Sequence, residues 1–264
     1  MKTTPEKIIR EIESVIKNKD IKTSLFLMAK ISSIAKKYRK INEPKIKNTL
    51  NYVTDNLKLQ SPENLKKTIE TRIKDYWEIR DSSKITQNIL SKIRNSSVVF
   101  LYGNPKLAKK SLREAKERGI RFSVITTDSG PKNSGRIAAN ELSKSKIAVK
   151  HIPDFLICQA IKNADLVLFE AQAALQNKII ADLGAEQVVN LARENHIPAY
   201  CYIDIFSIDR SGNLREEHFE EDKKPKKQNP TMINKTKSAI DAGKITAAIT
   251  QSGILEIKGL IKSR

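Results

Sequence analysis

The spacing of apolar residues changes once along the chain, near residue 95. Before that point apolar residues recur every three or four positions, as in Ile8, Ile9, Ile12 and Ile16, which is the period of a helix with one packed face. Residues 1–95 also contain no glycine, and their prolines stand where helices would begin. We therefore predict a bundle of four or five helices over residues 1–95.

From residue 96 onward, short runs of apolar and β-branched residues alternate with helical patterns. Four runs are typical of strands: Val98–Tyr102, Arg121–Thr126, Leu166–Phe169 and Ala199–Phe206. Leu166–Phe169 is uninterrupted, as in a strand that is buried on both faces. Strands that alternate with helices predict a parallel sheet covered by helices. The expected fold class is therefore α/β, with a Rossmann-like, doubly wound, mainly parallel sheet domain over residues 96–264.

Other segments complete the expected order. Pro153–Ile161 is expected to be a helix, Glu170–Asp182 a polar bend and Ile245–Thr250 a last strand. Residues 211–229 are rich in charge and are expected to form a long loop. The sequence contains no internal repeat.

Ligands of such sheets bind beyond the carboxyl ends of the strands, so the residues there are candidates for chemistry. Asp128, Glu170, Asp204 and Asp209 could transfer protons or hold Mg²⁺, but acids at strand ends also commonly cap turns. Gly103–Lys106 could bind a phosphate at a helix N-terminus, or could be an asparagine cap followed by proline. With no GxGxxG, no P-loop and no ligand spacing among the histidines, we expect no cofactor and no metal.

Positive charge is the strongest signal in the composition. The formal net charge is +19, and residues 1–95 carry 22 Lys/Arg against 11 Asp/Glu. Such a charge attracts polyanions such as RNA, although lysines on a helix are often only a solvated face. RNA binding through a basic surface and simple solvation are therefore both open.

Cysteine usage and hydropathy indicate the compartment. Cys158 and Cys201 stand in apolar runs, which predicts two reduced, packed thiols. No apolar run is long enough to cross a membrane, and the N-terminus is unlike a signal peptide. We therefore expect a cytoplasmic protein without membrane contact.

Five segments in order give residues 85–264 a resemblance to a known family. They are VVFLYGNPKLAKKSLREA, TTDSGPKNSGRIAANEL, ADLVLFEAQAALQN, IPAYCYIDIFSID and ITAAITQSGIL. They are similar to a strand ending in Thr-His-Cys/Gly/Ala, a Thr-Glu-Ser-Arg-Pro segment followed by Gly-Arg, a Gly-Ala-Asp/Glu…Asn-Gly segment, an Ile-Pro-Phe-Tyr-Val strand and a C-terminal Ile-Thr…Thr-x-x-Gly motif. The family contains the alpha, beta and delta subunits of translation initiation factor 2B, together with methylthioribose-1-phosphate and ribose-1,5-bisphosphate isomerases.

Departures from the isomerases bear on catalysis. In the isomerases a cysteine after the first strand and an aspartate in the Gly-Ala-Asp motif are the implied acid–base pair, but the matching positions here are Gly103 and Gln172. Neither glycine nor a glutamine amide transfers protons near neutral pH. Gly130 stands in place of the substrate-holding arginine, whereas Arg136 and Asn177 are kept. The resemblance therefore implies that the chain has no catalytic residues.

The resemblance implies a non-catalytic regulatory or scaffold protein in translation initiation. It implies a homodimer or larger oligomer formed through residues 96–264, and the alpha subunit of initiation factor 2 as a partner, met by the basic N-terminal bundle. A residual pocket is expected to bind a nucleotide or sugar phosphate as an effector. Its candidate residues are Gly103, Asn104, Asp128, Gly130, Arg136, Glu170, Gln172 and Asn177. The alternative is a sugar-phosphate isomerase of the ribose-1,5-bisphosphate type, with Asp128, Glu170 or Asp204 in place of the usual pair.

Overall fold

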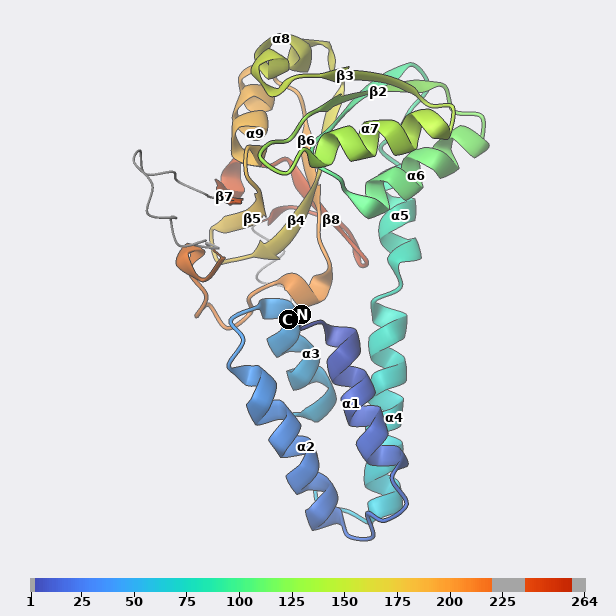
Figure 1. Cartoon of the computed structure of the whole chain (residues 1–264), viewed down its shortest axis with the longest axis vertical. Helices are drawn as coiled ribbons and strands as arrows, with labels where there is room; N and C mark the ends of the chain where they lie inside the picture. Colours follow the sequence, from blue (N-terminus) through green and yellow to red (C-terminus); the bar gives the residue numbers. More distant parts are fainter. Residues whose placement is uncertain (1–2, 220–235, 258–264) are drawn as a thin grey trace. The chain divides into compact units, whose positions relative to one another are not determined.

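The chain forms two compact units, Met1–Asp81 and Ser82–Arg264, here called the helical unit and the sheet unit (Figure 1). The computed structural model describes residues 3–219 and 236–257. Most of the loop expected over residues 211–229 lies outside the described residues, and so does the chain after residue 257.

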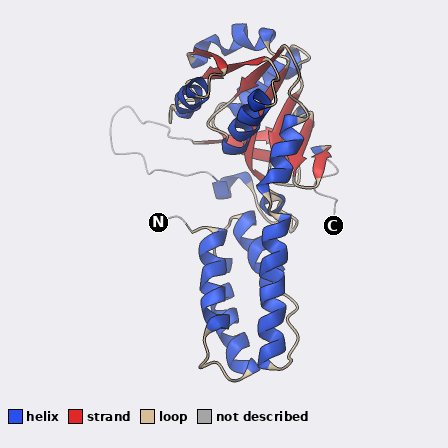
Figure 2. Ribbon diagram, turned by 90° about the vertical axis from the view of Figure 1, so that its right-hand side faces the viewer, coloured by secondary structure: helices blue, strands red, loops and turns tan. Residues whose placement is uncertain are grey.

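The helical unit is a bundle of antiparallel neighbours (Figure 2). Its described helices are α1 (Pro5–Lys17), α2 (Ser24–Arg39), α3 (Pro44–Thr54) and α4 (Pro62–Ile79). Proline occupies the first turn of α1, α3 and α4, where a missing N–H costs nothing, and the side chains of Thr4, Thr23 and Ser61 cap α1, α2 and α4. Isoleucines and leucines at helical spacing fill the interior, so the expected helical character of this part is confirmed.

Helix α5 (Ser82–Leu90) belongs to the sheet unit, although the expected boundary after residue 95 grouped it with the bundle. Its buried residues Ile85 and Ile89 share a core cluster with Leu112 of the helix that follows the first strand. This packing explains why the compact sheet unit begins at Ser82.

The sheet unit is a mainly parallel sheet in the order β3-β2-β1-β4-β6-β8-β9, in which β9 is antiparallel. The bounds are β1 (Ser97–Leu101), β2 (Phe122–Thr127), β3 (Ala148–Ile152), β4 (Leu166–Ala174), β6 (Ala199–Tyr202), β8 (Ala247–Thr250) and β9 (Gly253–Leu255). The six parallel strands have the order of a Rossmann sheet. The order in which successive strands are added reverses between β1 and β4, although these two strands are parallel. The expected doubly wound α/β fold is confirmed.

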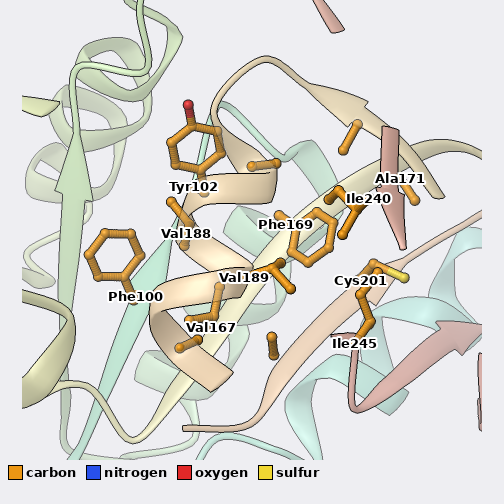
Figure 3. Packing of buried hydrophobic residues seen from close by; sticks show 14 of the residues in the cluster. Phe100, Tyr102, Val167, Phe169, Ala171, Val188, Val189, Cys201, Ile240 and Ile245 are labelled. Carbon is orange, nitrogen blue, oxygen red and sulfur yellow. The ribbon is translucent and has the colours of Figure 1, made fainter. Parts of the chain in front are cut away.

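Helices cover both faces of this sheet (Figure 2). They are α6 (Lys106–Glu117), α7 (Ser134–Lys144), α8 (Ile157–Ala160) and α9 (Ala185–Glu194), with short 3₁₀ turns η1 (Asp154–Leu156), η2 (Ile161–Asn163), η3 (Ile205–Ser207), η4 (Glu216–Phe219) and η5 (Ala242–Lys244). Side chains of β1 alternate between the faces: Phe100 packs with Val188 and Val189 of α9 (Figure 3), whereas Val99 and Leu101 join α5, α6 and α7. The expected helix Pro153–Ile161 is η1 followed by α8 and the start of η2.

The expected polar bend Glu170–Asp182 is wrong, because this segment forms a β-hairpin. Strand β4 continues to Ala174, turns, and returns antiparallel as β5 (Lys178–Asp182), which then pairs with β7 (Lys237–Asp241). Polar Glu170 and Gln172 alternate here with buried Ala171 and Ala173, which is the period of a strand with one packed face. The hairpin extends β4 beyond the carboxyl edge of the parallel sheet.

The two cysteines differ in environment. Cys201 of β6 is buried, and burial raises the pKa of its thiol to about 12. Cys158 of α8 is exposed, so the expectation that both thiols are packed is wrong for this residue. Within the described residues, no helix is both long and apolar enough to span a bilayer.

A tight joint between β2 and α7 leads to the first prediction. A Cβ atom on Gly135 would lie 1.9 Å from the carbonyl oxygen of Thr127, which is backbone and cannot move aside. We expect Gly135→Ala to destabilise the sheet unit by about 3 kcal/mol, measured as a lower midpoint of urea unfolding by circular dichroism. Gly243→Ala is the matched control, since its Cβ would make only an ordinary contact at 3.6 Å. Equal midpoints for the two variants would contradict the packing described here.

Candidate functional site

The candidate site lies where β1 and β4 run side by side and their connections leave in opposite directions. The chain after β1 turns into α6, whereas the chain after β4 continues into the β4–β5 hairpin and then α9. In open α/β sheets this switch point is where ligands enter. The residues that follow β1 therefore define the floor of the site.

Gly103 forms this floor and brings β1 close to the end of β5. Its backbone has φ +78°, a left-handed conformation suited to glycine, and its N–H donates to Ser129 Oγ at 3.1 Å. A Cβ atom on Gly103 would lie 3.4 Å from Asp182 Oδ2. The position at which the isomerases of the resemblance carry cysteine thus faces a carboxylate.

Asp182 is a site residue that the expected set does not include, although it ends the same segment as the candidates Glu170, Gln172 and Asn177. Its Oδ1 accepts hydrogen bonds from Gln172 Nε2 at 2.9 Å and from Lys237 Nζ at 3.0 Å. The Lys237 side chain is 14% exposed and that of Asp182 is 36% exposed, so the ion pair is partly shielded from water. Gln172 therefore holds a carboxylate by hydrogen bonding, while β7 supplies the cation.

The space left between these groups is small. A cavity of about 10 Å³ is lined by Tyr102, Asn104, Pro105, Phe169, Glu170, Asp182 and Ala185. This volume holds about one water molecule, far below the roughly 300 Å³ of an ordinary ligand pocket. Asn104 Oδ1 is buried at this place and has no hydrogen-bond partner among the described residues. The cavity can therefore take a single small hydrogen-bond donor, but not a sugar phosphate.

Tyr102 closes one side of the cavity. Its hydroxyl donates to the carbonyl of Leu183 at 2.5 Å, and Gly184 permits this approach because a Cβ there would lie 2.0 Å from Tyr102 Oη. Burial first, and then the charges of Asp154 and Asp182, raise the pKa of Tyr102 well above its ordinary value. The phenol therefore stays protonated near neutral pH and acts as a structural donor.

A second polar cluster surrounds Asp128 at the end of β2. Arg136 Nη2 donates to Asp128 Oδ1 at 2.9 Å, and His151 Nε2 lies 3.1 Å from the same oxygen. His151 Nδ1 is in turn 2.9 Å from Thr126 Oγ1, but Thr126 is fully buried and cannot reach a substrate. The cluster ties the end of β2 to β3 and α7.

Two further acids near strand ends, Asp154 and the expected candidate Asp204, have structural partners. Asp154 accepts from the N–H groups of Ser129 and Gly130, each at 2.8 Å, and so holds the loop after β2. Asp204 accepts from Phe206 N at 3.0 Å as the cap of η3. These contacts explain why acids occur at strand ends here without forming an acid–base pair.

Asp209 and Asn177 also lie outside the cavity lining. Buried Asp209 accepts from Ser211 N at 3.1 Å and from Leu214 N at 2.8 Å, so it shapes a turn. Asn177 stands in the turn of the β4–β5 hairpin, where its carbonyl accepts from Ala242 N at 3.0 Å. Because the hairpin pairs Ala174 with Ile179 next to this turn, Asn177 lies at the opposite end of the hairpin from Asp182.

The structure therefore divides the expected pocket. Gly103, Asn104, Gln172 and Glu170 gather around Asp182. Asp128 and Arg136 form the separate cluster at the end of β2, and Gly130 belongs to the loop held by Asp154. Among the residues that the structure describes, no group of three His, Cys, Asp or Glu side chains could hold a metal ion.

The Asp128 cluster predicts a pH-dependent contribution to stability. Hydrogen bonding to Arg136 first, and to His151 next, holds the pKa of Asp128 below its usual value of 3.8. A folded pKa below the unfolded one gives stability that is present above about pH 4 and is lost as the pH falls through the folded pKa. We expect Asp128→Asn to lower the unfolding free energy at pH 7, and to lower it progressively less as the pH falls below about 4, as measured by urea unfolding. Asp20→Asn, at an exposed aspartate, is the control; a pH-independent loss for Asp128→Asn would contradict the assignment.

Comparison with known proteins relates this fold to one family. The sequence profile of the Initiation factor 2 subunit family matches residues 3–256. Translation initiation factor eIF2B subunit alpha of Dictyostelium discoideum is 29% identical over 190 residues, which cover 66% of this chain and 59% of that protein. Ribose 1,5-bisphosphate isomerase of Methanocaldococcus jannaschii is 27% identical over 156 residues, which cover 57% of this chain and 49% of that enzyme. The chain thus spans about half to three fifths of the length of these relatives.

Solved structures show the same fold over nearly the whole chain. Translation initiation factor eIF-2B of Pyrococcus horikoshii OT3 matches with a TM-score of 0.68 at 17% identity, covering 96% of this chain and 98% of that one. A chain of the tetrameric eIF2B-beta2-delta2 complex from C. thermophilum matches with a TM-score of 0.76 at 16% identity, covering 99% of this chain and 89% of that one. The family includes both eIF2B subunits and sugar-phosphate isomerases, which agrees with the resemblance read from the sequence. This chain belongs to the Initiation factor 2 subunit family.

Proposed function

We propose that this chain is a non-catalytic regulatory or scaffold protein of translation initiation, and not a sugar-phosphate isomerase. The observation that supports the proposal most directly is the pairing at the switch point. Glycine stands where the isomerases of the resemblance carry a cysteine, and Asp182, held by Gln172 and Lys237, occupies the space beside it.

Acid–base chemistry at this place lacks its two partners. Moving a proton between neighbouring sugar carbons needs one group that removes it and one that returns it on the other side. Gly103 has no side chain, and the amide of Gln172 donates its N–H to Asp182. Each missing acid or base costs about 10²-fold in rate or more, so the loss of both would leave little turnover.

The other acids are too dispersed to replace that pair. Asp128 is bound to Arg136 and contacts His151 at one strand end, and Asp204 caps η3 beyond β6. Only Glu170 of the three acids considered lines the cavity beside Gly103. The alternative function as an isomerase therefore has two carboxylates near the site, Glu170 and Asp182, and no thiol. Asp182 is already held by Gln172 and Lys237.

A phosphorylated effector would have to compete with Asp182. Lys237 is bound to Asp182, so the charge of its ammonium group is already neutralised by that carboxylate. A nucleotide or sugar phosphate would bind here only if Asp182 moved away from Lys237 and the 10 Å³ cavity opened. We infer that effector binding and opening of the β5 end are coupled.

The same proposal includes the partners. We propose a cytoplasmic protein that forms a homodimer or larger oligomer through residues 96–264 and that meets the alpha subunit of initiation factor 2 with its basic N-terminal helices. The family membership supports this assignment, and so does the positive charge of residues 1–95, which contain 22 Lys/Arg against 11 Asp/Glu. In the sheet unit, Phe155 of η1 is 81% exposed, which is unusual for a large apolar residue and suits a contact between copies.

Ribose 1,5-bisphosphate separates the two functions. We expect the purified chain to give no turnover of this substrate, with the Methanocaldococcus jannaschii isomerase as the active control. Calorimetry with the same compound distinguishes a closed site, which gives no heat, from an open site that binds without reacting. Turnover that disappears in Glu170→Gln, Asp128→Asn or Asp204→Asn would contradict the proposal and support the isomerase.

Self-association is tested by sedimentation velocity across a wide range of protein concentrations. We expect a mass of at least two chains, and a shift toward a single chain in Phe155→Asp because a buried charge would oppose the contact. Leu25→Asp is the matched control, since Leu25 is 71% exposed but belongs to the helical unit. Adding the alpha subunit of initiation factor 2 is expected to produce a faster species; a single-chain mass at all concentrations would contradict the oligomer.

A further inference from the structure

Cations gather at the edge of the sheet where the parallel strands begin, here called the basic edge. Six connecting segments lead into these strands: 91–96, 118–121, 145–147, 164–165, 195–198 and 245–246. Together they contain five Lys/Arg and one acid: Lys92, Arg94, Arg118, Arg121, Lys146 and Asp165. Because all parallel strands begin on the same side, the topology brings these residues to one edge.

Most of these cations lack a compensating charge. Arg118, the residue directly after α6, forms an ion pair with Glu114 of the same helix. For Lys92, Arg94, Arg121 and Lys146, no carboxylate lies within ion-pairing distance in the part of the chain that the structure describes. Their mutual repulsion favours any polyanion that can span them.

Backbone contacts place three of these cations in a row. Strands β3, β2 and β1 are neighbours, about 4.8 Å apart, and are preceded by Lys146, Arg121 and Arg94 respectively. The segment before β1 is tied to the segment before β2, since Ser96 N donates to the carbonyl of Arg121 at 2.6 Å and Arg121 N donates to Asn95 Oδ1 at 2.9 Å. The row is therefore set by the sheet itself.

The row ends at a cleft that contains an aromatic ring. This cleft has a volume of about 390 Å³ and is lined by Lys92, Arg94, Asn95, Ser96, Asp165 and Tyr200, among others. Tyr200 of β6 is half-buried, and Lys92 Nζ lies 5.1 Å from the centroid of its ring. The one carboxylate, Asp165, is engaged by Val98 N at 2.7 Å. The cleft thus combines cations, amide and hydroxyl groups, and a ring face.

The opposite edge of the sheet has the reverse character. Asp128, Asp154, Glu170, Asp182 and Asp204 stand at or beyond the carboxyl ends of the strands. Arg136 and Lys237 at that edge are already bound to carboxylates. A polyanion therefore meets one acid among five cations at the basic edge, whereas at the other edge it meets these five carboxylates beside the exposed Lys106 and Lys132.

We propose that the basic edge binds single-stranded RNA. Lys146, Arg121 and Arg94 contact successive phosphates, Tyr200 stacks on a base, and Lys92 beside its ring contacts a phosphate at the same place. A groove of cations that follows the backbone, with an aromatic platform for bases, is the arrangement by which proteins bind single strands without sequence preference. The polar groups of Asn95 and Ser96 are positioned for contacts with the sugar hydroxyls that distinguish RNA from DNA.

The test uses the full chain and a fluorescently labelled single-stranded RNA of about 16 nucleotides. Anisotropy is measured over a range of salt concentrations, since each phosphate contact adds about −0.7 to the slope of log K against log salt. We expect Arg94→Gln/Arg121→Gln to lower the affinity about tenfold or more and to reduce the slope by about 1.4. Neither guanidinium has a carboxylate partner in the described residues, so the fold is expected to survive, as circular dichroism would verify.

Lys132→Gln/Arg210→Gln is the matched control, because it removes the same charge from exposed side chains that follow the carboxyl ends of β2 and β6. We expect this control to bind RNA as the wild type does. Equal losses in the two double variants would overturn the proposal in favour of diffuse attraction by the net charge of +19. Competition by polyglutamate as strong as that by unlabelled RNA would also overturn it, and would indicate an acidic protein partner.

The stacking role of Tyr200 has a separate signature. We expect Tyr200→Leu to weaken RNA binding about tenfold with an unchanged salt slope, because a base–aromatic contact is lost and no phosphate contact is. Tyr200→Phe keeps the ring and is expected to keep the affinity. A changed slope in Tyr200→Leu, or full affinity without the ring, would exclude this placement of the RNA.

Discussion

The ion pair between Asp182 and Lys237 decides what the carboxyl edge of the sheet can accept. Strand β7 brings Lys237 beside β5, and the carboxylate that it binds fills the space above Gly103. Separating two partly shielded opposite charges is costly unless another group replaces the lost partner. The switch point, which in open α/β sheets admits a ligand, is thus occupied by the chain's own side chains. The assignment of a scaffold role depends on this single interaction.

The two edges of the same sheet differ in the charged residues that they carry. At the strand ends, Asp154 and Asp204 accept hydrogen bonds from backbone N–H groups, and Asp128 binds Arg136. At the edge where strands begin, Arg94 and Arg121 form no ion pair among the described residues. Regular secondary structure explains the difference, because a parallel sheet separates strand starts from strand ends by the length of a strand. The net charge calculated from composition adds the charges of both edges together, so it does not show how they are distributed.

Local sequence patterns predicted most helices and strands, but they could not predict contacts between residues that are distant in sequence. The apolar run Leu166–Phe169 and its alternation with helical patterns predicted the parallel sheet, since periodicity is a local property. The β4–β5 hairpin was missed because Ala171 and Ala173 are weak signals for a strand, although they alternate with polar residues. Asp182 could not be predicted as a site residue, because its position beside Gly103 depends on three strands meeting. The resemblance identified the family and the missing cysteine, but not what replaces it.

The loss of a thiol at Gly103 also changes how the protein responds to oxidants and alkylating reagents. Cys201 is buried with a pKa raised to about 12, so very little reactive thiolate forms there. Cys158 is exposed on α8, and the sequence contains no third cysteine. A maleimide dye or a spin label would therefore attach at one defined position of the native chain, without any engineered substitution, and would report on the surroundings of α8.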